Sequence, residues 1–338
     1  MMIRTVFHYG VILPGLAMIL SSCILAYNYQ AEILFPAQID VSPDVENVGV
    51  FCRMDLGPNP SGYFSGNEWE KSFKSDSALL KQAILGLEDG LIESPRYSVI
   101  ETITKRNLPG FLPQPSKNLN WKFLRNIYPD STGLLIELAT ASFSDTVIDL
   151  NTNDNIVENY YCILSTFFWR LYNFNAKEIS LYRIQDTTII EFRNRGNNFR
   201  LQDTRHLLRL MNSASYNAGI SFASGIAPTW KEINRIYYKS SIPIFHPAEK
   251  LVVEGDWKGA AEEWLPFTKS NNKIIASRAS FNMAVAAEMT DHFALAIEWL
   301  EKSKELGQKR YVDEYTADLL DRISQKAKLD LQFGELEQ

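Results

Sequence analysis

The chain has 338 residues, of which 46% are hydrophobic and 22% are charged, and its formal net charge is −6. This length favours two domains, and the apolar fraction excludes both whole-chain disorder and a multi-span membrane protein. The acidic balance argues against a nucleic-acid partner, because phosphate binding needs clustered Lys and Arg. Three cysteines and four histidines leave little material for a disulfide framework or a metal cluster. We therefore expect neither a metal nor another cofactor.

Residues 1–22 have the pattern of a secretory signal peptide. Arg4 supplies one positive charge before a mainly apolar run, which is shorter than the roughly 20 apolar residues of a membrane span. The run closes with Leu20-Ser21-Ser22-Cys23. This ending resembles the lipobox of bacterial lipoproteins and implies cleavage before Cys23, which then carries the lipid. An uncleaved signal anchor that continues into residues 24–26 is the alternative.

The residue after Cys23 indicates the destination of the anchor. In lipoproteins of the type that this segment resembles, an aspartate at that position retains the protein in the inner membrane. Here the position is Ile24, and residues 24–30 lack the acidic cluster that sends some lipoproteins to the cell surface. We expect the chain to be held at the outer membrane on the periplasmic side, while inner-membrane anchoring stays open.

Strand and helix signals alternate after the tether and leading strand of residues 23–44. A β-rich apolar run predicts a strand at 45–54, and a loop rich in Gly, Pro and Ser follows at 55–73. A helix begins after Ser75 or Asp76 and stops at Pro95, with its apolar residues on one stripe. A second strand at 97–103 completes a strand–helix–strand unit, which suggests a parallel pair.

Three runs of β-branched and aromatic residues come next. A short amphipathic piece at 121–127 precedes them, and short polar turns separate them, so they predict an antiparallel meander. The runs cover residues 133–148, 157–172 and 179–192. A helix at 201–222 and a strand at 230–238 complete a domain over 45–242, whose fold class is α+β, a mixed sheet with packed helices.

From about residue 244 the strand signals vanish and a self-match appears at a spacing of 36 residues. Ala248 matches Ala284, Trp257 matches Phe293, and similar turns precede both aromatic residues. This pattern resembles the tetratricopeptide repeat, in which small residues let paired helices pack closely. The resemblance implies an all-α tetratricopeptide-like helical repeat domain over 243–328, closed by a final helix at 311–327 and followed by a tail at 329–338. Most of the acidity lies here, with 12 basic against 17 acidic residues in 244–338.

Five segments occur in a characteristic order along the mature chain. They are residues 34–39 (LFPAQI), 47–50 (NVGV) with Arg53, 169–172 (WRLY), 227–230 (APTW) with Arg235, Tyr237 and Tyr238, and 255–257 (GDW). This series resembles a family of bacterial lipoproteins of unknown function that join an α/β domain to a tetratricopeptide-like tail. By fold pattern alone, the α/β part is also similar to envelope lipoproteins that activate cell-wall synthases or build the curli secretion pore. Neither resemblance implies an activity.

Motifs for catalysis or metal binding are incomplete. Residues 57–62 have the glycine spacing of a phosphate-binding loop, but Tyr63 follows where Lys is needed. The Asn-rich stretch from Asp149 lacks the Gly and Glu of a calcium loop and predicts a hairpin turn. His206, His246 and His292 are far apart and form no zinc-ligand pattern. We therefore predict no catalytic residue, no metal site and no enzyme activity.

Two cysteines and four polar residues are candidates for structural or binding roles. Cys52 and Cys162 fall in predicted strands and could form a disulfide or remain buried thiols, the alternative that we favour. Arg170 and Arg235 lie in aromatic strand segments, where a salt bridge or cation–π contact is favoured over anion or partner binding. Arg278 and Asn282 occupy positions that face the concave groove of repeat proteins, where they could hold a peptide; plain helix-surface solvation is the favoured alternative.

The sequence as a whole indicates an interaction protein. We expect an outer-membrane lipoprotein that faces the periplasm and acts as a protein-binding or scaffolding module of the cell envelope, with an envelope protein or peptide as its partner and the membrane contacted through the lipid anchor. The alternative is an oligomerising component, or an activator, of an envelope secretion or cell-wall assembly system. A hydrolase of the envelope would require an acid, a base and a cleft to meet.

Overall fold

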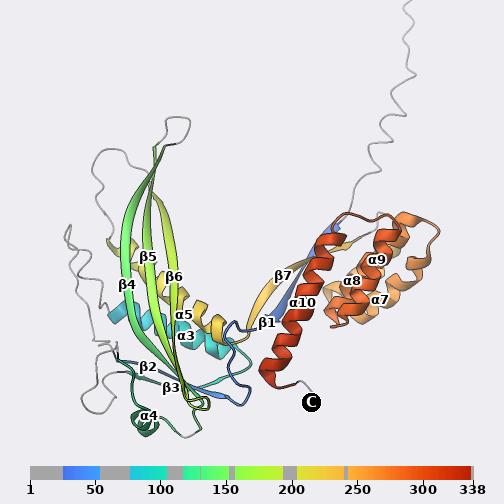
Figure 1. The fold of residues 1–338 in the computed structure, drawn as a ribbon. Helices are drawn as coiled ribbons and strands as arrows, with labels where there is room; N and C mark the ends of the chain where they lie inside the picture. Colours follow the sequence, from blue (N-terminus) through green and yellow to red (C-terminus); the bar gives the residue numbers. More distant parts are fainter. Residues whose placement is uncertain are drawn as a thin grey trace, which may run out of the picture. The chain divides into compact units, whose positions relative to one another are not determined.

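The structure, a computed structural model, describes residues 26–53, 77–104, 117–129, 131–151, 157–192, 204–239 and 243–335 (Figure 1). The predicted signal peptide, Cys23 and the phosphate-loop-like segment at 57–62 lie outside these residues. The chain divides into two compact units. We call residues 26–33 with 232–325 the helical unit, and residues 34–231 with 326–335 the sheet unit, and describe each by itself.

The sheet unit contains a five-stranded mixed sheet in the order β3-β2-β4-β5-β6. β2 runs parallel to both β3 and β4, whereas β4, β5 and β6 form the predicted antiparallel meander. The α+β fold class with a mixed sheet is therefore confirmed. The elements are β2 (Asn47–Cys52), α3 (Ser77–Glu93), β3 (Ser98–Thr104), α4 (Trp121–Ile127), β4 (Leu134–Asn151), β5 (Val157–Asn173), β6 (Glu178–Phe192) and α5 (Thr204–Ile226).

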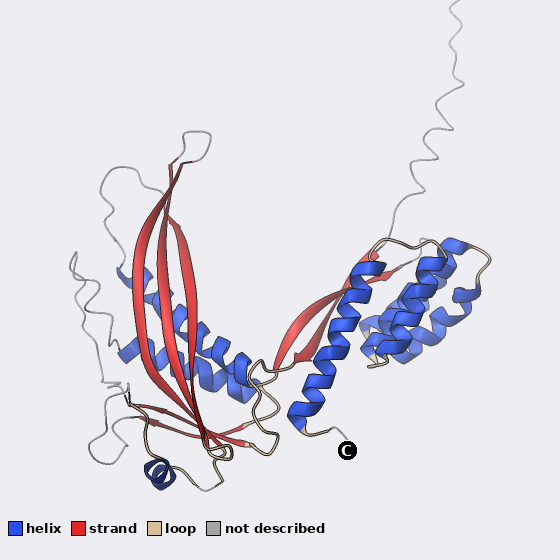
Figure 2. Cartoon of the chain, in the orientation of Figure 1, coloured by secondary structure: helices blue, strands red, loops and turns tan. Residues whose placement is uncertain are grey.

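Helices α3 and α5 pack together against one face of this sheet (Figure 2). The two backbones touch at glycines: a Cβ atom on Gly86 would lie 2.0 Å from the Tyr216 carbonyl oxygen, and one on Gly219 would lie 2.1 Å from that of Ala83. Any side chain at either position would force the helices apart. Phe222 of α5 packs on the sheet. Its ring stacks on the ring of Trp169 in β5, with 5.0 Å between the two ring centroids.

Tyr97, the residue before the edge strand β3, connects this strand to the end of α5. Its side chain is buried, and its hydroxyl donates to the Ile226 carbonyl oxygen at 3.0 Å. Burial raises the pKa of Tyr97 to about 12, against a smaller opposing effect of the Arg96 charge. The folded state therefore binds the phenol proton more tightly than the unfolded state, whose pKa is near 10.0.

We expect the folded state to lose stability between pH 10 and 12 because of Tyr97. Since one pKa unit corresponds to 1.36 kcal/mol, raising the pH from 9 to 11 removes about 1 kcal/mol from the free energy of unfolding. A Tyr97→Phe variant lacks this contribution. The difference in the free energy of unfolding between wild type and variant should therefore shrink by that amount between pH 9 and pH 11. Urea unfolding of both proteins at the two pH values measures it; a difference that is independent of pH would contradict the role of Tyr97.

A second, two-stranded sheet is formed by β1 (Ala26–Phe35) and β7 (Thr229–Tyr238). The prediction that the strand at 230–238 joins the mixed sheet is therefore wrong. Its last two residues, Tyr237 and Tyr238, are buried in the core of the helical unit rather than against β2–β6. The strand signal in the sequence was correct, but aromatic residues of this kind do not specify which surface covers them.

The helical unit confirms the change from strands to helices near residue 244. Gly255 and Asp291 both have positive φ values, 77° and 59°. At the next residue in each turn the main-chain N–H donates to the carbonyl five residues back, from Asp256 to Leu251 and from His292 to Ala287. The 36-residue spacing of the sequence thus recurs in the turn geometry. The elements are α6 (His246–Val253), α7 (Trp257–Trp264), α8 (Lys273–Met289), α9 (Phe293–Glu305) and α10 (Val312–Phe333), with short 3-10 turns at Pro243–Phe245 and Leu265–Lys269.

The domain boundaries differ from the predicted ones at 242 and 328. The units divide between residues 231 and 232, because the end of β7 packs with the helices, and α10 continues to Phe333 rather than ending at 327. The end of α10 is fixed within the sheet unit, where the Gln332 amide exchanges two hydrogen bonds with the Ala37 backbone at 3.0 and 2.9 Å. Among the described residues, no helix has the length and apolar character that crossing a membrane requires.

Candidate functional site

Asn282 of α8 holds the end of strand β7 inside the helical unit. Its side-chain oxygen accepts from the Tyr238 N–H and its amide donates to the Tyr238 carbonyl, both at 2.7 Å. The Asn282 amide therefore makes the two hydrogen bonds to Tyr238 that the main chain of a neighbouring strand would otherwise make. Asn282 is fully buried, and β7 of the same chain already occupies this position. The prediction that Asn282 lines a groove for a peptide of another protein is therefore wrong.

Arg278 lies one helical turn before Asn282 on the same helix. It is half-buried, and its guanidinium lies 5.6 Å from the centre of the Tyr238 ring. The Tyr238 hydroxyl in turn accepts from the Gln308 side chain at 2.5 Å. The two predicted groove residues thus act together on one tyrosine of β7, and neither is a solvated helix-surface residue. Arg278 and Asn282 therefore contact β7 of the same chain.

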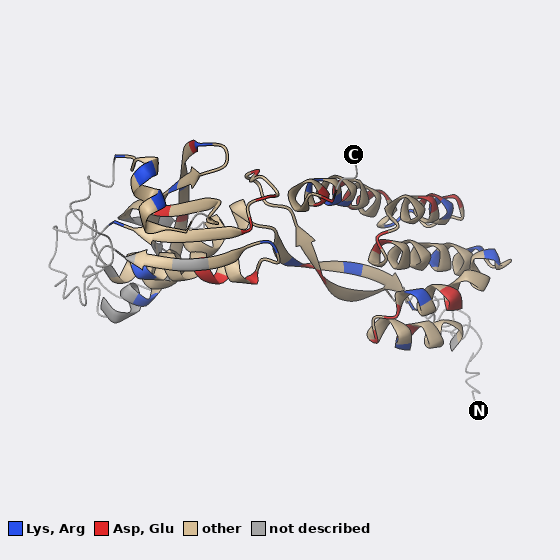
Figure 3. Cartoon of the chain, turned by 90° about the horizontal axis from the view of Figure 1, so that it is seen from below, with Lys and Arg blue, Asp and Glu red and all other residues tan. Residues whose placement is uncertain are grey.

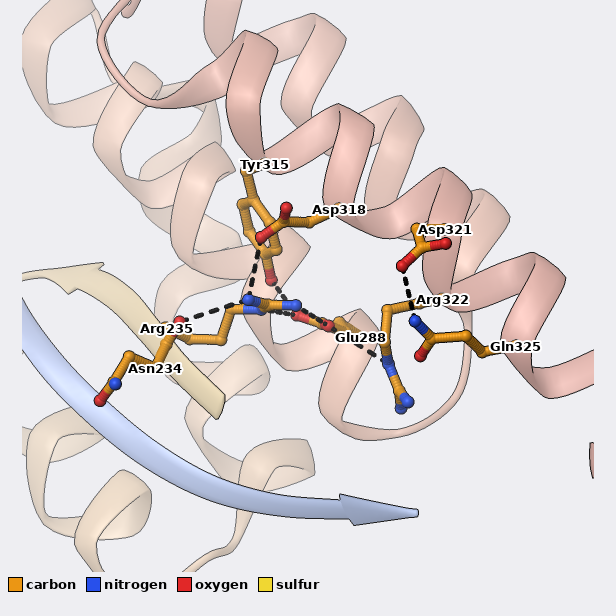
Figure 4. Close-up of polar contacts among 8 residues, drawn as sticks. All are labelled: Asn234, Arg235, Glu288, Tyr315, Asp318, Asp321, Arg322 and Gln325. Atoms are coloured by element: carbon orange, nitrogen blue, oxygen red, sulfur yellow. Dashed lines mark hydrogen bonds and ion pairs between the residues drawn. The ribbon is translucent and has the colours of Figure 1, made fainter. Parts of the chain in front are cut away.

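A buried ion pair joins β7 to α8 next to this contact (Figure 4). The Arg235 guanidinium donates from Nε to Glu288 Oε2 at 2.7 Å and from Nη2 to Oε1 at 2.8 Å, and both side chains are almost completely buried. The Tyr315 hydroxyl of α10 donates to the same Oε2 at 2.5 Å. The prediction that Arg235 makes a salt bridge or a cation–π contact is confirmed on both counts, since its guanidinium also lies 5.1 Å from the centre of the Tyr315 ring.

The protonation states in this cluster follow from its burial. Burial raises the pKa of Tyr315 well above 10.0, and the charge of Glu288 raises it further, so the phenol stays a donor. Burial alone would lower the pKa of Arg235, but the hydrogen bonds and charge of Glu288 outweigh it and the net shift is upward. Arg322 lies farther out, 3.8 Å from Glu288, and burial lowers its pKa. The cluster is therefore a fixed charge pair rather than a proton-transfer site.

An open pocket of about 180 Å³ lies beside the ion pair, between β7 and α10. Arg235 forms part of its wall, but Nε and Nη2 of this residue bind Glu288, and Nη1 binds Asp318 at 3.1 Å and the Asn234 carbonyl at 3.2 Å. Glu314 and Asp318 remain exposed at the mouth. Tyr311, also in the wall, has a φ of 66°, which is rare for a bulky residue. The lining residues are Asn234, Arg235, Ile236, Phe281, Tyr311, Glu314, Tyr315 and Asp318.

The sheet unit contains a separate buried charge cluster. Glu137 of β4 is fully buried and accepts from Arg53 Nε at 2.5 Å and from Arg170 Nη1 at 2.6 Å. The Tyr172 hydroxyl also donates to this carboxylate at 3.0 Å, and burial and the Glu137 charge raise the pKa of the phenol. The predicted salt bridge of Arg170 is confirmed. This cluster links three strands and has a structural role.

Sequence reasoning missed both carboxylates, although a signal for each was present. Glu137 stands alone in an apolar strand run, and Glu288 follows a run of alanines on a helix without an exposed face. A single acidic residue in such a run is costly to bury unless it is paired. This cost predicts a buried basic partner for each carboxylate, and these partners are Arg170 for Glu137 and Arg235 for Glu288.

The two remaining cysteines cannot pair within one chain. Phe51, next to Cys52, lies opposite Glu137 on β4, whereas Cys162 lies opposite Thr146, nine residues farther along the same strand. At about 3.3 Å per residue this separation is about 30 Å, and a disulfide needs Cα atoms within about 7 Å. Both cysteines are buried, and the Cys52 thiol lies 3.8 Å from the Leu138 carbonyl oxygen. The disulfide alternative is therefore wrong.

The histidines are not brought together in the described parts of the chain. His246 and His292 are both exposed and lie in the helical unit at the starts of separate helices. Within the described residues, no group of three or more His, Cys, Asp or Glu side chains could hold a metal ion. The histidine positions therefore add no candidate site to the pocket and the two charge clusters.

These observations define a two-part chain, in which a mixed α+β sheet is followed by a helical region with a small polar pocket. Two family models match it: a domain of unknown function, DUF8603, over residues 45–238, and a second domain of unknown function, DUF6340, over residues 246–327. Because the first match covers more than half of the chain, the protein belongs to the DUF8603 family. The two matches meet near the change from strands to helices. No curated protein matches the sequence.

Proposed function

We propose that this protein is a lipoprotein of the outer membrane, anchored through Cys23, that faces the periplasm and binds another envelope protein. The ending of residues 20–23 supports the anchor, through its resemblance to a lipobox. The 36-residue spacing, present in both the sequence and the two turns at Gly255 and Asp291, supports a tetratricopeptide-like helical region. Repeat regions of this kind serve as binding surfaces.

The observation that carries the binding role is the open pocket between β7 and α10. Its walls combine three aromatic rings with two exposed carboxylates, while the buried charges beside it already satisfy one another. A pocket with preformed walls and exposed carboxylates at its mouth is suited to recognition. By contrast, the carboxylates Glu137 and Glu288 are buried and paired with arginines, so they are not available to a guest.

An oligomerising envelope component is a second candidate, favoured by the edge of the main sheet. β6 is the last strand in the sheet order and is 15 residues long. It exposes Leu181 and Ile189, at 56% and 62% of their surface. Long edge strands with exposed apolar residues can pair with another strand. Light scattering distinguishes this candidate, because a monomer at high concentration would exclude self-assembly through β6.

Photocrosslinking in intact cells tests the proposed function. A photoreactive phenylalanine in place of Tyr311 is expected to crosslink to one discrete envelope protein, because Tyr311 lines the pocket. The same residue in place of Val253, which is 81% exposed on α6, provides the matched control. Cys23→Ala in the same strain is expected to release the protein from the outer-membrane fraction and to weaken the crosslink, because both partners are no longer concentrated at one membrane.

Two results would contradict the proposal separately. If Cys23→Ala protein still sediments with the outer membrane, the lipid anchor is wrong. If Tyr311 and Val253 give the same products, or if neither gives any, the helical region is not a protein-binding surface at this pocket. Outer- and inner-membrane vesicles separated on a density gradient also decide between the two anchoring sites.

A further inference from the structure

We propose that the pocket between β7 and α10 binds an extended polypeptide segment of the partner, which pairs with the main chain of Ile236 on β7 and inserts one basic side chain, Lys or Arg, between the aromatic rings and the carboxylates. This inference rests on the proposed binding function and specifies the chemistry of the partner.

The edge of β7 that faces the pocket follows from the Asn282 contact. In a strand, the N–H and C=O groups of residues i and i−2 point to the same edge. Both main-chain groups of Tyr238 point toward α8, where the Asn282 amide binds them. The main-chain groups of Ile236 therefore point to the same side, and Ile236 lines the pocket. An incoming strand can bind Ile236 as the Asn282 amide binds Tyr238, whereas the Asn234 carbonyl on the same edge already accepts a hydrogen bond from Arg235 Nη1 at 3.2 Å.

Charge selects a cation for the side-chain position. Arg235 is the basic residue in the pocket wall, and Glu288, Asp318 and the Asn234 carbonyl engage its Nε, Nη1 and Nη2 atoms. An anion would have to displace these contacts. Glu314 and Asp318 are exposed at the mouth, and half of the Asp318 side-chain surface is accessible. A guest ammonium or guanidinium can reach both carboxylates.

The aromatic walls favour the same kind of guest. Phe281, Tyr311 and Tyr315 line the pocket. Arg235 and Arg310 already lie 5.1 and 4.5 Å from the centres of the Tyr315 and Tyr311 rings, so these rings attract cations in the folded chain. The aliphatic stem of Lys or Arg can pack on such rings while its charged end reaches the carboxylates. The combination of rings and acids therefore fits a long basic side chain better than a short polar or an apolar one.

The pocket size matches a side chain rather than a small-molecule ligand. Its volume of about 180 Å³ lies below the ~300–1,000 Å³ typical of small-molecule sites. It corresponds to about six water molecules at ~30 Å³ each, enough for one long side chain. The remaining affinity would come from main-chain pairing along β7, as in other cases of strand addition.

A labelled seven-residue peptide of alternating Thr and Val around a central Lys tests the proposal with the full-length protein. Fluorescence anisotropy is expected to show saturable binding. Acetylation of the central Lys, which removes its charge, is expected to weaken binding about tenfold. N-methylation of single peptide amides is expected to abolish binding at alternate positions only, because a strand uses every second amide for one neighbour. These changes are made in the peptide, so they leave the fold of the protein intact.

A protein variant locates the guest charge. Glu314→Gln is expected to weaken binding of the Lys peptide about threefold to fivefold, as for other exposed ion pairs, and to leave the acetylated peptide unaffected. Glu301→Gln, a matched change of an exposed carboxylate on α9, is expected to have no effect on either peptide.

Three outcomes would overturn the proposal: no binding of the Lys peptide, equal binding of its acetylated form, or equal effects of N-methylation at all positions. If one of these occurs while Tyr311 still crosslinks to an envelope protein, the chemistry assigned to the guest is wrong and the binding function stands. If the peptide behaves as expected but no crosslink forms in cells, the pocket chemistry stands and the proposed envelope partner fails.

Discussion

A Glu137→Gln variant is expected to lower the free energy of unfolding of the sheet unit by about 3–5 kcal/mol. The carboxylate is fully buried and is shared by two buried guanidiniums, at 2.5 Å from Arg53 and 2.6 Å from Arg170. Glutamine keeps the shape but removes the negative charge, so both arginines lose the charge that they share. It also directs an amide NH₂ toward groups that are themselves donors.

The position of this cluster explains why the effect should be large. Arg53 follows β2, Glu137 lies on β4 and Arg170 lies on β5, so the three charges connect adjacent strands of the mixed sheet. Tyr172 donates to the same carboxylate. Removing one partner of a buried pair is costly because the other charge stays buried, whereas the net contribution of the intact pair can be small.

Hydrogen exchange of the full-length protein measures the change in the correct unit. Amides of β4 and β5 should exchange faster in Glu137→Gln, by the factor that corresponds to the lost free energy. Glu178→Gln, at an exposed position on β6, serves as the control and should change exchange little. A Glu137→Gln/Arg170→Met double variant should lose less than the sum of the two single variants, because removing both charges relieves part of the cost. Additive losses would show that the pair is not coupled.

The mixed sheet was largely predictable because its signals are local. Alternating β-branched and aromatic residues with short polar turns defined β4, β5 and β6 to within a few residues, and a strand–helix–strand order correctly gave the parallel pair of β2 and β3. The short amphipathic piece predicted around Trp121–Ile127 is helix α4. In each case the signal for a single helix or strand lies within about 20 consecutive residues.

The candidate site was harder to predict because its parts come from distant segments. Arg235 and Glu288 are 53 residues apart, and Tyr315 lies a further 27 residues along the chain. Arg278 and Asn282 were expected to be solvated or to hold a peptide of a partner, and the sequence does not show that residues 235–238 of the same chain fill that place. Tyr311, which lines the pocket beside them, has a positive φ that no residue-type preference indicates.

A Glu288→Gln variant is expected to separate β7 from the helices and to destabilise the helical unit by about 3–5 kcal/mol. Glu288 accepts two hydrogen bonds from Arg235 and one from Tyr315, and Arg322 lies 3.8 Å away. With glutamine at this position, Arg235 keeps Asp318 as its charged partner, and that carboxylate is half exposed. The largest increases in hydrogen exchange should therefore appear in β7 and α8 together.

The matched control for this variant breaks an ion pair of similar length on the surface. Lys304 and Asp313 lie 2.5 Å apart with both side chains at least half exposed, so Asp313→Asn should cost no more than about 1 kcal/mol. A comparable effect of the two substitutions would show that burial does not determine the strength of the Glu288 contact. If exchange increases in α8 but not in β7, Arg235 is not the group that holds the strand, and the Asn282 amide alone fixes the edge at which a partner segment would bind.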